Sequence, residues 1–273
     1  MNSSRIEKRI SASEVWPGHW ESYRRTSKLT YNYAIVNDYP LEFWSDDIGN
    51  AFGRPYLSWT QAEVWRKGDR NGHAEYFRRY FQGQKLPTTP QMLLGAKIAK
   101  ALAEIEKPIE QVCEEQGWQS TEQEMKMLQH YRHFLPRYAH REVEIQQKFR
   151  GVPLLAKPDG FDLYGTDEKI VRIVLGEDKS GKSWNQERAD EHKQIDLYDI
   201  VFWQKYGVIP ENTLHWIPTY KDGSGEYRPT GEIFDYPTPR TEAQLIESGA
   251  EFIRIWHEIG EAYGEECRAN GLI

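Results

Sequence analysis

Cysteine is scarce in this chain. It has two cysteines, Cys113 and Cys267, among 273 residues, so one chain cannot supply the four thiolates of a four-cysteine zinc or iron–sulfur centre. The two lie far apart in the sequence, and a structural disulfide between them is not expected. This usage suits a reducing compartment, and we therefore expect a cytoplasmic protein.

Long apolar runs and a surplus of positive charge are also missing. Charged residues interrupt every apolar stretch of the opening MNSSRIEKRISASEVW, and no later run has the length of a membrane-spanning helix. We therefore expect neither secretion nor a membrane partner. The formal net charge is -7 at pH 7, which argues against a protein that coats nucleic acid indiscriminately, because phosphate neutralisation requires many lysines and arginines.

One segment is nevertheless both basic and aromatic. Arginine and lysine alternate with tryptophan, tyrosine and phenylalanine over residues 65–85, and Arg78 and Arg79 lie within this segment. Such a mixture can contact a phosphate backbone and stack on bases. An amphipathic helix with a solvated basic face is the competing structural interpretation.

The apolar pattern predicts one α/β domain over residues 1–273, beginning with an arm and a helical region. Residues 1–50 show no clear period and are expected to form the arm. Residues 51–140 are expected to be helical. Helices are predicted to open at Ser58 in LSWTQAEVW, to span LLGAKIAKALAEIEK, and to follow the cap residue Ser120.

Strand patterns replace the helical ones in residues 141–222. The segments REVEIQQKF, VPLLAKPDGFDLY and KIVRIVLGEDKSG predict an antiparallel meander of three strands. A helix with Ser183 as its N-cap and Gly207 as its stop follows, and TLHWIPTY predicts one further strand. Residues 223–273 predict a loop and a last amphipathic helix that Thr241 caps.

The predicted sheet carries a group of residues suited to phosphodiester hydrolysis. Glu177 and Lys179 are two apart at the end of IVRIVLGEDK, so their side chains project from one face while that of Asp178 points away. Asp159, beside Pro158 on the preceding strand, can stand opposite Glu177. Hydrolysis needs a hard cation held by grouped carboxylates. We expect Asp159 and Glu177 to bind Mg2+ or Mn2+, and Lys179 to orient water or offset charge on the phosphate.

Two further metal ligands are candidates: the backbone carbonyl of Asp178, and Glu144 on the strand before. The acid-any-lysine triplet has little weight alone, and a surface strand end with an ion pair would explain it equally well. It also occurs at Glu124, Asp167 and Glu191. Only the copy at Glu177 follows a hydrophobic strand and has a Pro-Asp strand upstream.

The helix after this strand places Gln194 and Tyr198 four residues apart and hence on one face. Together with the Pro-Asp strand and the acid-any-lysine strand, this Gln-x-x-x-Tyr helix resembles the RecB-like branch of the PD-(D/E)XK nucleases. PYLSWTQAEVW and LLGAKIAKALAE are similar to earlier helices of that family, and the resemblance covers roughly Leu57 to Asp222. It implies a restriction-endonuclease-like core, a mixed central sheet flanked by helices, with a helical N-terminal half.

The same resemblance implies a metal-dependent DNA nuclease, for which exonuclease is favoured over endonuclease activity. DNA end processing, recombination or repair, in a phage or its bacterial host, are the roles that it suggests. DNA is the expected partner, with a recombination protein or further copies of the chain as additional candidates. The candidate DNA contacts are Ser58, Arg78, Arg79, Lys182, Trp184, Gln194 and Tyr198.

One position departs from the family pattern. Many relatives have a metal-binding histidine four residues after the glycine of the LLGAKIAKALAE helix, and this chain has Ala99 there. Glu104 or Glu144 could compensate for the missing ligand. The departure also leaves open a nucleic-acid-binding module that keeps the fold without turnover.

A different motif overlaps the same residues. GEDKSGKS, from Gly176 to Ser183, matches the phosphate-binding P-loop pattern G-x-x-x-x-G-K-[ST] between a strand and a helix. Glu177 and Asp178 oppose this interpretation, because they would place carboxylates where a polyphosphate binds. A P-loop domain also needs further parallel strands, and TLHWIPTY is the one strand expected after Ser183.

Overall fold

The structure, a computed structural model, describes residues 9–10, 56–68, 72–81, 84, 87–166, 168–181 and 183–269. The expected N-terminal arm lies outside the described residues except for strand β1 (Arg9–Ile10). This strand pairs antiparallel with strand β6 (Gly160–Thr166). The described part of the arm therefore joins the main sheet.

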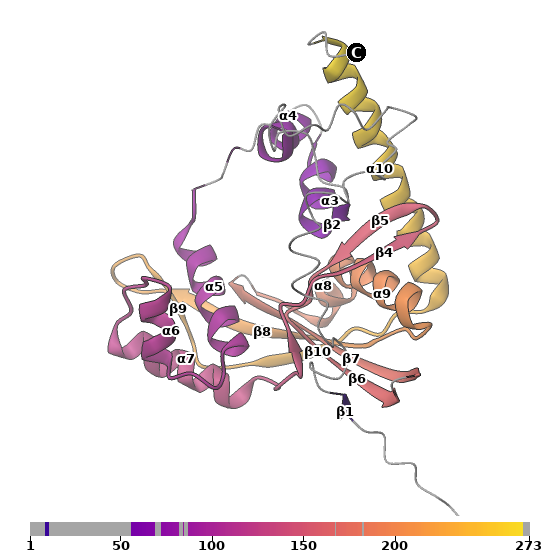
Figure 1. Cartoon of the computed structure of the whole chain (residues 1–273). Coiled ribbons are helices and arrows are strands. Elements are labelled where there is room, and N and C mark those ends of the chain that lie inside the picture. Colours follow the sequence, from indigo (N-terminus) through magenta and orange to yellow (C-terminus); the bar gives the residue numbers. More distant parts are fainter. Residues whose placement is uncertain are drawn as a thin grey trace, which may run out of the picture.

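The main sheet is mixed. Beside β1 and β6 it contains β3 (His140–Arg141), β7 (Lys169–Gly181), β8 (Glu211–Lys221), β9 (Tyr227–Pro229) and β10 (Phe234–Pro237). Its order is β1–β6–β7–β8–β10, with β3 beside β6 and β9 beside β8. β6 and β7 are antiparallel, whereas β7 and β8 are parallel. Helices flank this sheet (Figure 1), which confirms the expected mixed α/β fold.

A second, smaller sheet joins β2 (Leu57–Ser58), β5 (Val152–Ala156) and β4 (Ile145–Phe149) in that order. The predicted three-strand meander is therefore wrong, because VPLLAKPDGFDLY divides into β5 and β6, which belong to different sheets. The division falls at Pro158, whose nitrogen has no hydrogen to donate to a ladder. Asp159 consequently lies in a bend between two hairpins rather than on a strand.

The helices of the described region largely follow the predicted pattern. Those before the sheet are α3 (Trp59–Arg66), α4 (Gly72–Tyr76), the π-helix η4 (Phe77–Phe81), α5 (Pro90–Ala103), α6 (Ile109–Glu115) and α7 (Glu122–Phe134). Those after β7 are α8 (Gln186–Asp190), α9 (Lys193–Tyr206) and α10 (Glu242–Ala269). Helices α3 and α10 begin directly after Ser58 and Thr241, as predicted.

Helix α7 begins one residue later than the sequence predicts. Thr121 is its cap, because Thr121 Oγ1 accepts a hydrogen bond from the Glu124 backbone N–H at 3.1 Å. The predicted cap, Ser120, is used elsewhere: its hydroxyl lies 3.1 Å from the ammonium of the buried Lys97. The local pattern assigns Ser120 to the helix cap, but its side chain instead forms a tertiary contact with Lys97.

The helix predicted from Ser183 to Gly207 is two helices. Asn185 rather than Ser183 caps α8, and its Oδ1 accepts from the Arg188 backbone N–H at 2.9 Å. The helical conformation is interrupted after Asp190, and His192 is the N-cap of the second helix, α9. Gly207 ends α9 in the left-handed conformation, with φ of 72°, as predicted.

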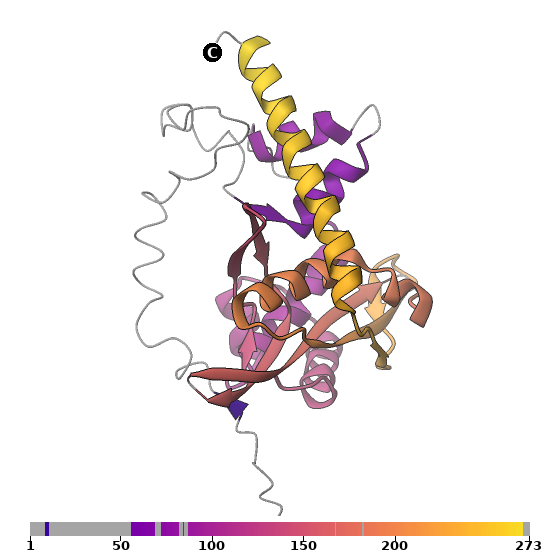
Figure 2. The ribbon, with the colours of Figure 1, turned by 90° about the vertical axis from the view of Figure 1, so that its right-hand side faces the viewer.

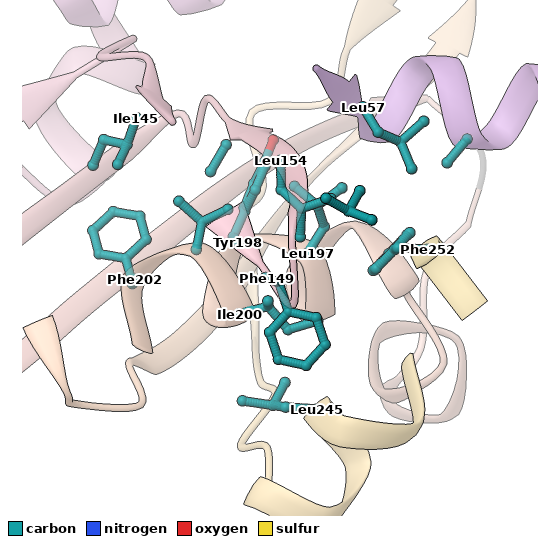
Figure 3. Close-up of a cluster of buried hydrophobic side chains, with 14 of the residues drawn as sticks. Leu57, Ile145, Phe149, Leu154, Leu197, Tyr198, Ile200, Phe202, Leu245 and Phe252 are labelled. Carbon is teal, nitrogen blue, oxygen red and sulfur yellow. The ribbon is translucent and has the colours of Figure 1, made fainter. Parts of the chain in front are cut away.

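Helix α9 is surrounded by other elements. Its Ile195, Leu197, Ile200, Val201 and Phe202 are all buried, and a helix that is apolar on most sides needs cover on most sides. Figure 3 shows that the β4–β5 hairpin and α10 supply this cover, through Phe149, Leu154, Leu245 and Phe252. Figure 2 shows α10 beginning beside α9 and running past α3 toward its C-terminal end. The packing fixes the position of α9 relative to both sheets.

Helices α5 and α9 lie on opposite faces of β7. Gln194 of α9 contacts Lys179, whereas a Cβ at Gly95 of α5 would lie 3.7 Å from Ser180 Oγ. Consecutive strand residues face opposite sides of a sheet, so α5 and α9 contact β7 from different faces. Within the described residues, no helix combines the length and the apolar character that crossing a membrane requires.

Candidate active site

Strand β7 extends past the end of its antiparallel partner. The pairing of β6 with β7 ends at Gly160 and Gly176, whereas β7 continues to Gly181 and, among the described residues, is paired there with β8 alone. From Glu177 onward, the other edge of β7 is therefore open toward the bend that holds Asp159.

Asp159 closes this open edge with its side chain. Asp159 Oδ2 accepts a hydrogen bond from the Asp178 backbone N–H at 2.6 Å. The contact satisfies a donor that β6 no longer reaches. It places Asp159 close enough to Glu177 for the two charges to interact, as expected from pairing of the two segments, although Asp159 itself lies in a bend and not on a strand.

Lys179 connects β7 to α9. Its ammonium contacts Glu177 Oε1 at 2.5 Å and donates to Gln194 Oε1 at 2.8 Å. Gln194 Nε2 in turn donates to the Tyr198 hydroxyl, which donates to the Lys157 carbonyl at 3.0 Å. The structure thus brings four of the predicted site residues into one hydrogen-bonded chain, which ends two residues before Asp159.

Burial and neighbouring charge shift the proton affinities of these groups. Burial, followed by repulsion from Glu177 and Asp178, raises the pKa of Asp159 well above its usual value. Burial also raises the pKa of Glu177, although Lys179 opposes the shift. For Lys179, burial lowers the pKa, but attraction to Glu177 and Asp159 outweighs it, so the pKa of the ammonium is raised. Lys179 is therefore a cation at neutral pH.

A cavity of about 260 Å³ opens beside these groups. Asp159, Glu177 and Lys179 line it from the sheet, and Gly95 and Ala99 line it from α5. Glu177 Oε2 is buried and has no hydrogen-bond partner among the described residues, an arrangement that costs free energy unless a ligand supplies the partner. Ala99, the position at which the sequence departs from the resembling pattern, thus belongs to the cavity wall.

The donor set fits a hard divalent cation. Three acidic residues, Asp159, Glu177 and Asp178, line one cavity, and Arg141 holds the Asp178 carboxylate; among the described residues no three His, Cys, Asp or Glu side chains are arranged to hold a metal. A bound ion would complete its coordination with a backbone carbonyl, water or substrate oxygens. Mg2+ often has only one or two carboxylate ligands and keeps several waters, whereas zinc is usually held by histidine and cysteine. The residues present therefore fit Mg2+ or Mn2+.

Arg141 supports the site from the other face of β7. Its guanidinium donates to Asp178 Oδ2 at 3.1 Å, to the Asp159 carbonyl at 3.4 Å and to the Pro136 carbonyl at 2.6 Å. The Arg141 and Asp178 side chains are each 8% exposed. Removing either partner would leave a buried charge unpaired, which strongly destabilises a protein. Arg141 is absent from the residues predicted for the site, because no local pattern indicates contacts this far along the chain.

The ring of Tyr138 covers the glycine pair beside the acids. A Cβ at Gly160 or Gly176 would come within 2.2 or 2.3 Å of Tyr138 side-chain atoms, so both positions require glycine for close approach. The Tyr138 hydroxyl lies 3.0 Å from His215 Nε2, and His215 Nδ1 lies 2.7 Å from Asp235 Oδ1. These contacts anchor the ring to β8 and β10.

Glu144 and Glu104, the proposed substitutes for the missing histidine, do not line the cavity. Glu144 is exposed just before β4. Glu104 follows α5 and forms ion pairs with Lys100 at 2.5 Å and Lys107 at 3.1 Å. Neither residue is placed to complete a cation site with Asp159.

Glu142 is the acid whose charge reaches the site instead. It forms an ion pair with Lys157 at 2.6 Å, and its negative charge contributes to the raised pKa of Glu177. Its φ of 56° is uncommon for a residue other than glycine. The alternating pattern of REVEIQQKF predicts one strand and does not single out Glu142. In the structure, β4 begins only at Ile145, so Glu142 lies before the strand.

The candidate DNA contacts fall into two groups. Ser58 caps α3, Arg78 is exposed on η4, and Arg79 forms an ion pair with Glu75. None of the first three residues lines the cavity. Lys182 lies outside the described residues.

Trp184 belongs with Gln194 and Tyr198 instead. Its ring meets His192 edge-on, with ring centroids 5.1 Å apart. His192 Nε2 lies 3.1 Å from Gln194 Oε1, the atom that also accepts from Lys179. Trp184 is therefore connected to Lys179 through two side chains.

The P-loop interpretation is excluded by the conformation of Gly176 to Gly181. These residues pair one by one with Thr213 to Pro218 of β8 as an extended strand. A phosphate-binding loop must instead curl so that consecutive backbone N–H groups converge on the phosphate. Carboxylates at Glu177 and Asp178 add repulsion to this misfit.

No model of a known protein family matches the sequence, and no curated protein matches it. Among solved structures, one similar to this chain is a protein from Eubacterium rectale named "putative exonuclease". It is 12% identical, with a TM-score of 0.48 over 81% of this chain and 85% of that chain. A second is SSO0001, 12% identical, with a TM-score of 0.27 over 59% of this chain and 74% of that chain.

Proposed function

We propose that this chain is a Mg2+- or Mn2+-dependent deoxyribonuclease. One observation carries the proposal: Asp159, Glu177 and Lys179 line the same cavity, and a buried oxygen of Glu177 has no partner within the described chain. Two acids and a fixed ammonium around one recess suit a cation together with an anionic phosphodiester.

The two acids and the lysine have separate roles in this proposal. Asp159 and Glu177 hold the cation, with the carbonyl of Asp178 as a further ligand. When bound, the cation polarises the phosphoryl oxygen and makes hydroxide available at neutral pH. Lys179 acts as a cation in this proposal, as its ion pair with Glu177 at 2.5 Å indicates. It offsets the negative charge that develops on the phosphate.

Gln194 is a positioning residue in the same proposal. Its Oε1 accepts from Lys179 at 2.8 Å, and its Nε2 donates to Tyr198. Because α9 is packed on several sides, this contact holds the flexible lysine side chain in one place. A positive charge that the fold already holds in place needs no reorganisation when negative charge develops in the transition state.

The test is cleavage of labelled DNA by purified protein with Mn2+. Lys179→Ala should reduce the rate about 100-fold or more, the usual effect of removing a charge-stabilising group, and EDTA should abolish it. Lys169→Ala is the matched control, because Lys169 is exposed at the opposite end of β7. Equal cutting by Lys179→Ala and wild type would mean that the activity comes from elsewhere.

We further propose that the nuclease acts on DNA ends, as in end processing, recombination or repair. The support is the recess: the Glu177 side chain is 3% exposed, so a strand with a free end reaches it more readily than an intact double helix. Linear DNA should be degraded and covalently closed circles should survive. Nicking of circles by wild type but not by Lys179→Ala would identify an endonuclease.

A second candidate is a binding module of the same fold without turnover. Ala99 in the cavity wall favours it, because a ligand that relatives use is missing there. This candidate requires DNA binding with no cutting in Mg2+ or Mn2+. It is excluded by cleavage that depends on Lys179.

A further inference from the structure

Three aromatic rings form a row beside Lys179, on the α9 side of β7. Trp59 at the start of α3 and Trp184 before α8 each meet His192 edge-on, with centroids 5.7 and 5.1 Å apart. All three residues are half-buried. Each therefore packs on the protein with one part and leaves another part open to solvent.

An arginine lies over each tryptophan at the two ends of this row. The guanidinium carbon of Arg66 is 5.1 Å from the Trp59 ring centroid, and that of Arg188 is 4.3 Å from the Trp184 centroid. Arg66 also forms an ion pair with Glu251, whereas Arg188 is exposed and donates to the Ser183 carbonyl. Aromatic rings interleaved with arginines are the surface on which unpaired bases stack and phosphates are attracted.

The row leads to the cavity through one side chain. Gln194 Oε1 is 3.1 Å from His192 Nε2 and accepts from the Lys179 ammonium at 2.8 Å. Burial lowers the pKa of His192 to about 3, so the ring is neutral at physiological pH and serves as an aromatic surface. A strand lying along the row would reach Gln194, and from there Lys179 at the open edge of β7 where the cavity lies.

A hollow of about 370 Å³ adjoins Trp184 at one end of the row. Glu187 and Glu191 line it together with Trp184 and Arg188. Two carboxylates repel a phosphate, but their oxygens can accept hydrogen bonds from the amino groups of a base. The hollow therefore suits a base that is held against Trp184, with its phosphates toward solvent and Arg188.

We propose that Trp59, His192 and Trp184 are a stacking platform for an unpaired DNA strand that runs into the Asp159 cavity. The strand must be unpaired, because the base faces of a duplex are already stacked on one another. The proposal deepens the nuclease function above and rests on it for what happens in the cavity. Stacking itself requires neither a metal nor cleavage.

The experiment is fluorescence anisotropy in EDTA with a labelled oligodeoxycytidylate, whose bases carry amino groups, and with a labelled duplex of mixed sequence. Wild type should bind the single strand more tightly than the duplex. Trp184→Leu, which keeps apolar packing but removes the aromatic face, should weaken single-strand binding about tenfold, within the range measured for one stacked base. Trp118→Leu is the matched control, because Trp118 is a half-buried tryptophan of the separate cluster around α5 to α7.

Two further variants keep the proposal testable if Trp184→Leu does not fold. Trp184→Phe retains a ring and should bind the single strand within about threefold of wild type. Arg188→Gln changes an exposed side chain and should weaken binding severalfold, whereas Arg254→Gln, an exposed arginine on α10, should not. Wild-type binding to both probes alike, or Trp184→Leu binding at the wild-type level, would overturn the platform.

Failure of the platform and failure of the nuclease are distinguishable. If cleavage depends on Lys179 but single-strand binding does not change in Trp184→Leu, the stacking platform is overturned and the nuclease function stands. Trp184-dependent binding without any cleavage supports the platform and overturns the nuclease.

Discussion

The Asp159 carboxylate accepts a hydrogen bond from the Asp178 backbone N–H at 2.6 Å, across the edge of β7 that β6 leaves open. The same side chain is the proposed metal ligand, so one carboxylate both closes the strand edge and faces the cavity. The Asp178 carboxylate points to the other face, where Arg141 holds it. Asp178 thus contributes its backbone N–H to Asp159 and its carboxylate to Arg141.

The stability of the metal-free protein should increase in Asp159→Asn at neutral pH. Burial and neighbouring carboxylates raise the pKa of Asp159 in the folded protein above its value in the unfolded chain. The contribution of Asp159 to the free energy of unfolding is therefore fully present at a pH below the unfolded-state pKa. It is lost as the pH rises through the folded-state pKa. Asparagine keeps the acceptor for Asp178 without the charge. Calorimetry in EDTA should show a higher Tm than wild type near pH 7, and a difference that vanishes below about pH 4. A lower Tm at pH 7 would contradict this account of the site.

Mn2+ should bind wild type with proton release and more tightly as pH rises, because the raised pKa values of Asp159 and Glu177 let protons compete with the ion. Asp159→Asn should weaken binding about tenfold or more, whereas Asp190→Asn, an exposed residue of α8, should not. Isothermal titration in buffers of different ionisation enthalpy measures both effects. Affinity that is independent of pH would exclude these acids as ligands.

Arg141→Gln should destabilise the protein by about 3–5 kcal/mol, the usual result of leaving one buried charge without its partner. The partner is Asp178, 3.1 Å away and equally buried. Urea unfolding should show that adding Asp178→Asn restores part of the loss. If the double variant is as unstable as the sum of the two single variants, the pair is not coupled.

Gly176→Ala should destabilise the protein by about 1–3 kcal/mol, because the added Cβ would lie 2.3 Å from the Tyr138 hydroxyl. Gly223→Ala is the matched control, since no atom lies within 4 Å of a Cβ at that position. Thermal unfolding of both variants, and of Gly176→Ala combined with Tyr138→Leu, measures the effect. The smaller leucine side chain should relieve the loss only if the tyrosine ring is the obstacle.

Ala99→His should tighten Mn2+ binding about tenfold, a size typical of changes around a metal site. Ala99 lines the cavity that Asp159 and Glu177 also line, so an imidazole there can add a ligand. Ala103→His on the exposed side of the same helix is the control. Equal affinities in the two histidine variants would show that position 99 does not face the ion.

Local patterns predict those parts of the site whose geometry depends on neighbouring residues. The two-residue spacing of Glu177 and Lys179 places them on one face of β7, and the four-residue spacing of Gln194 and Tyr198 places them on one face of α9. Strand and helix periods are fixed by backbone geometry. These relationships therefore follow from the sequence alone.

Tertiary contacts decide the remainder. The sequence cannot show that Ser120 meets Lys97 instead of capping α7, that VPLLAKPDGFDLY divides between two sheets, or that Arg141 holds Asp178. It also does not show that Trp59 and Trp184 meet at His192. Each of these depends on packing between segments far apart in the chain. Spacing thus determined that Glu177 and Lys179 share one face of β7 and that Gln194 and Tyr198 share one face of α9, because strand and helix periods are local, while long-range packing decided where Asp159 lies and which side chains share the cavity.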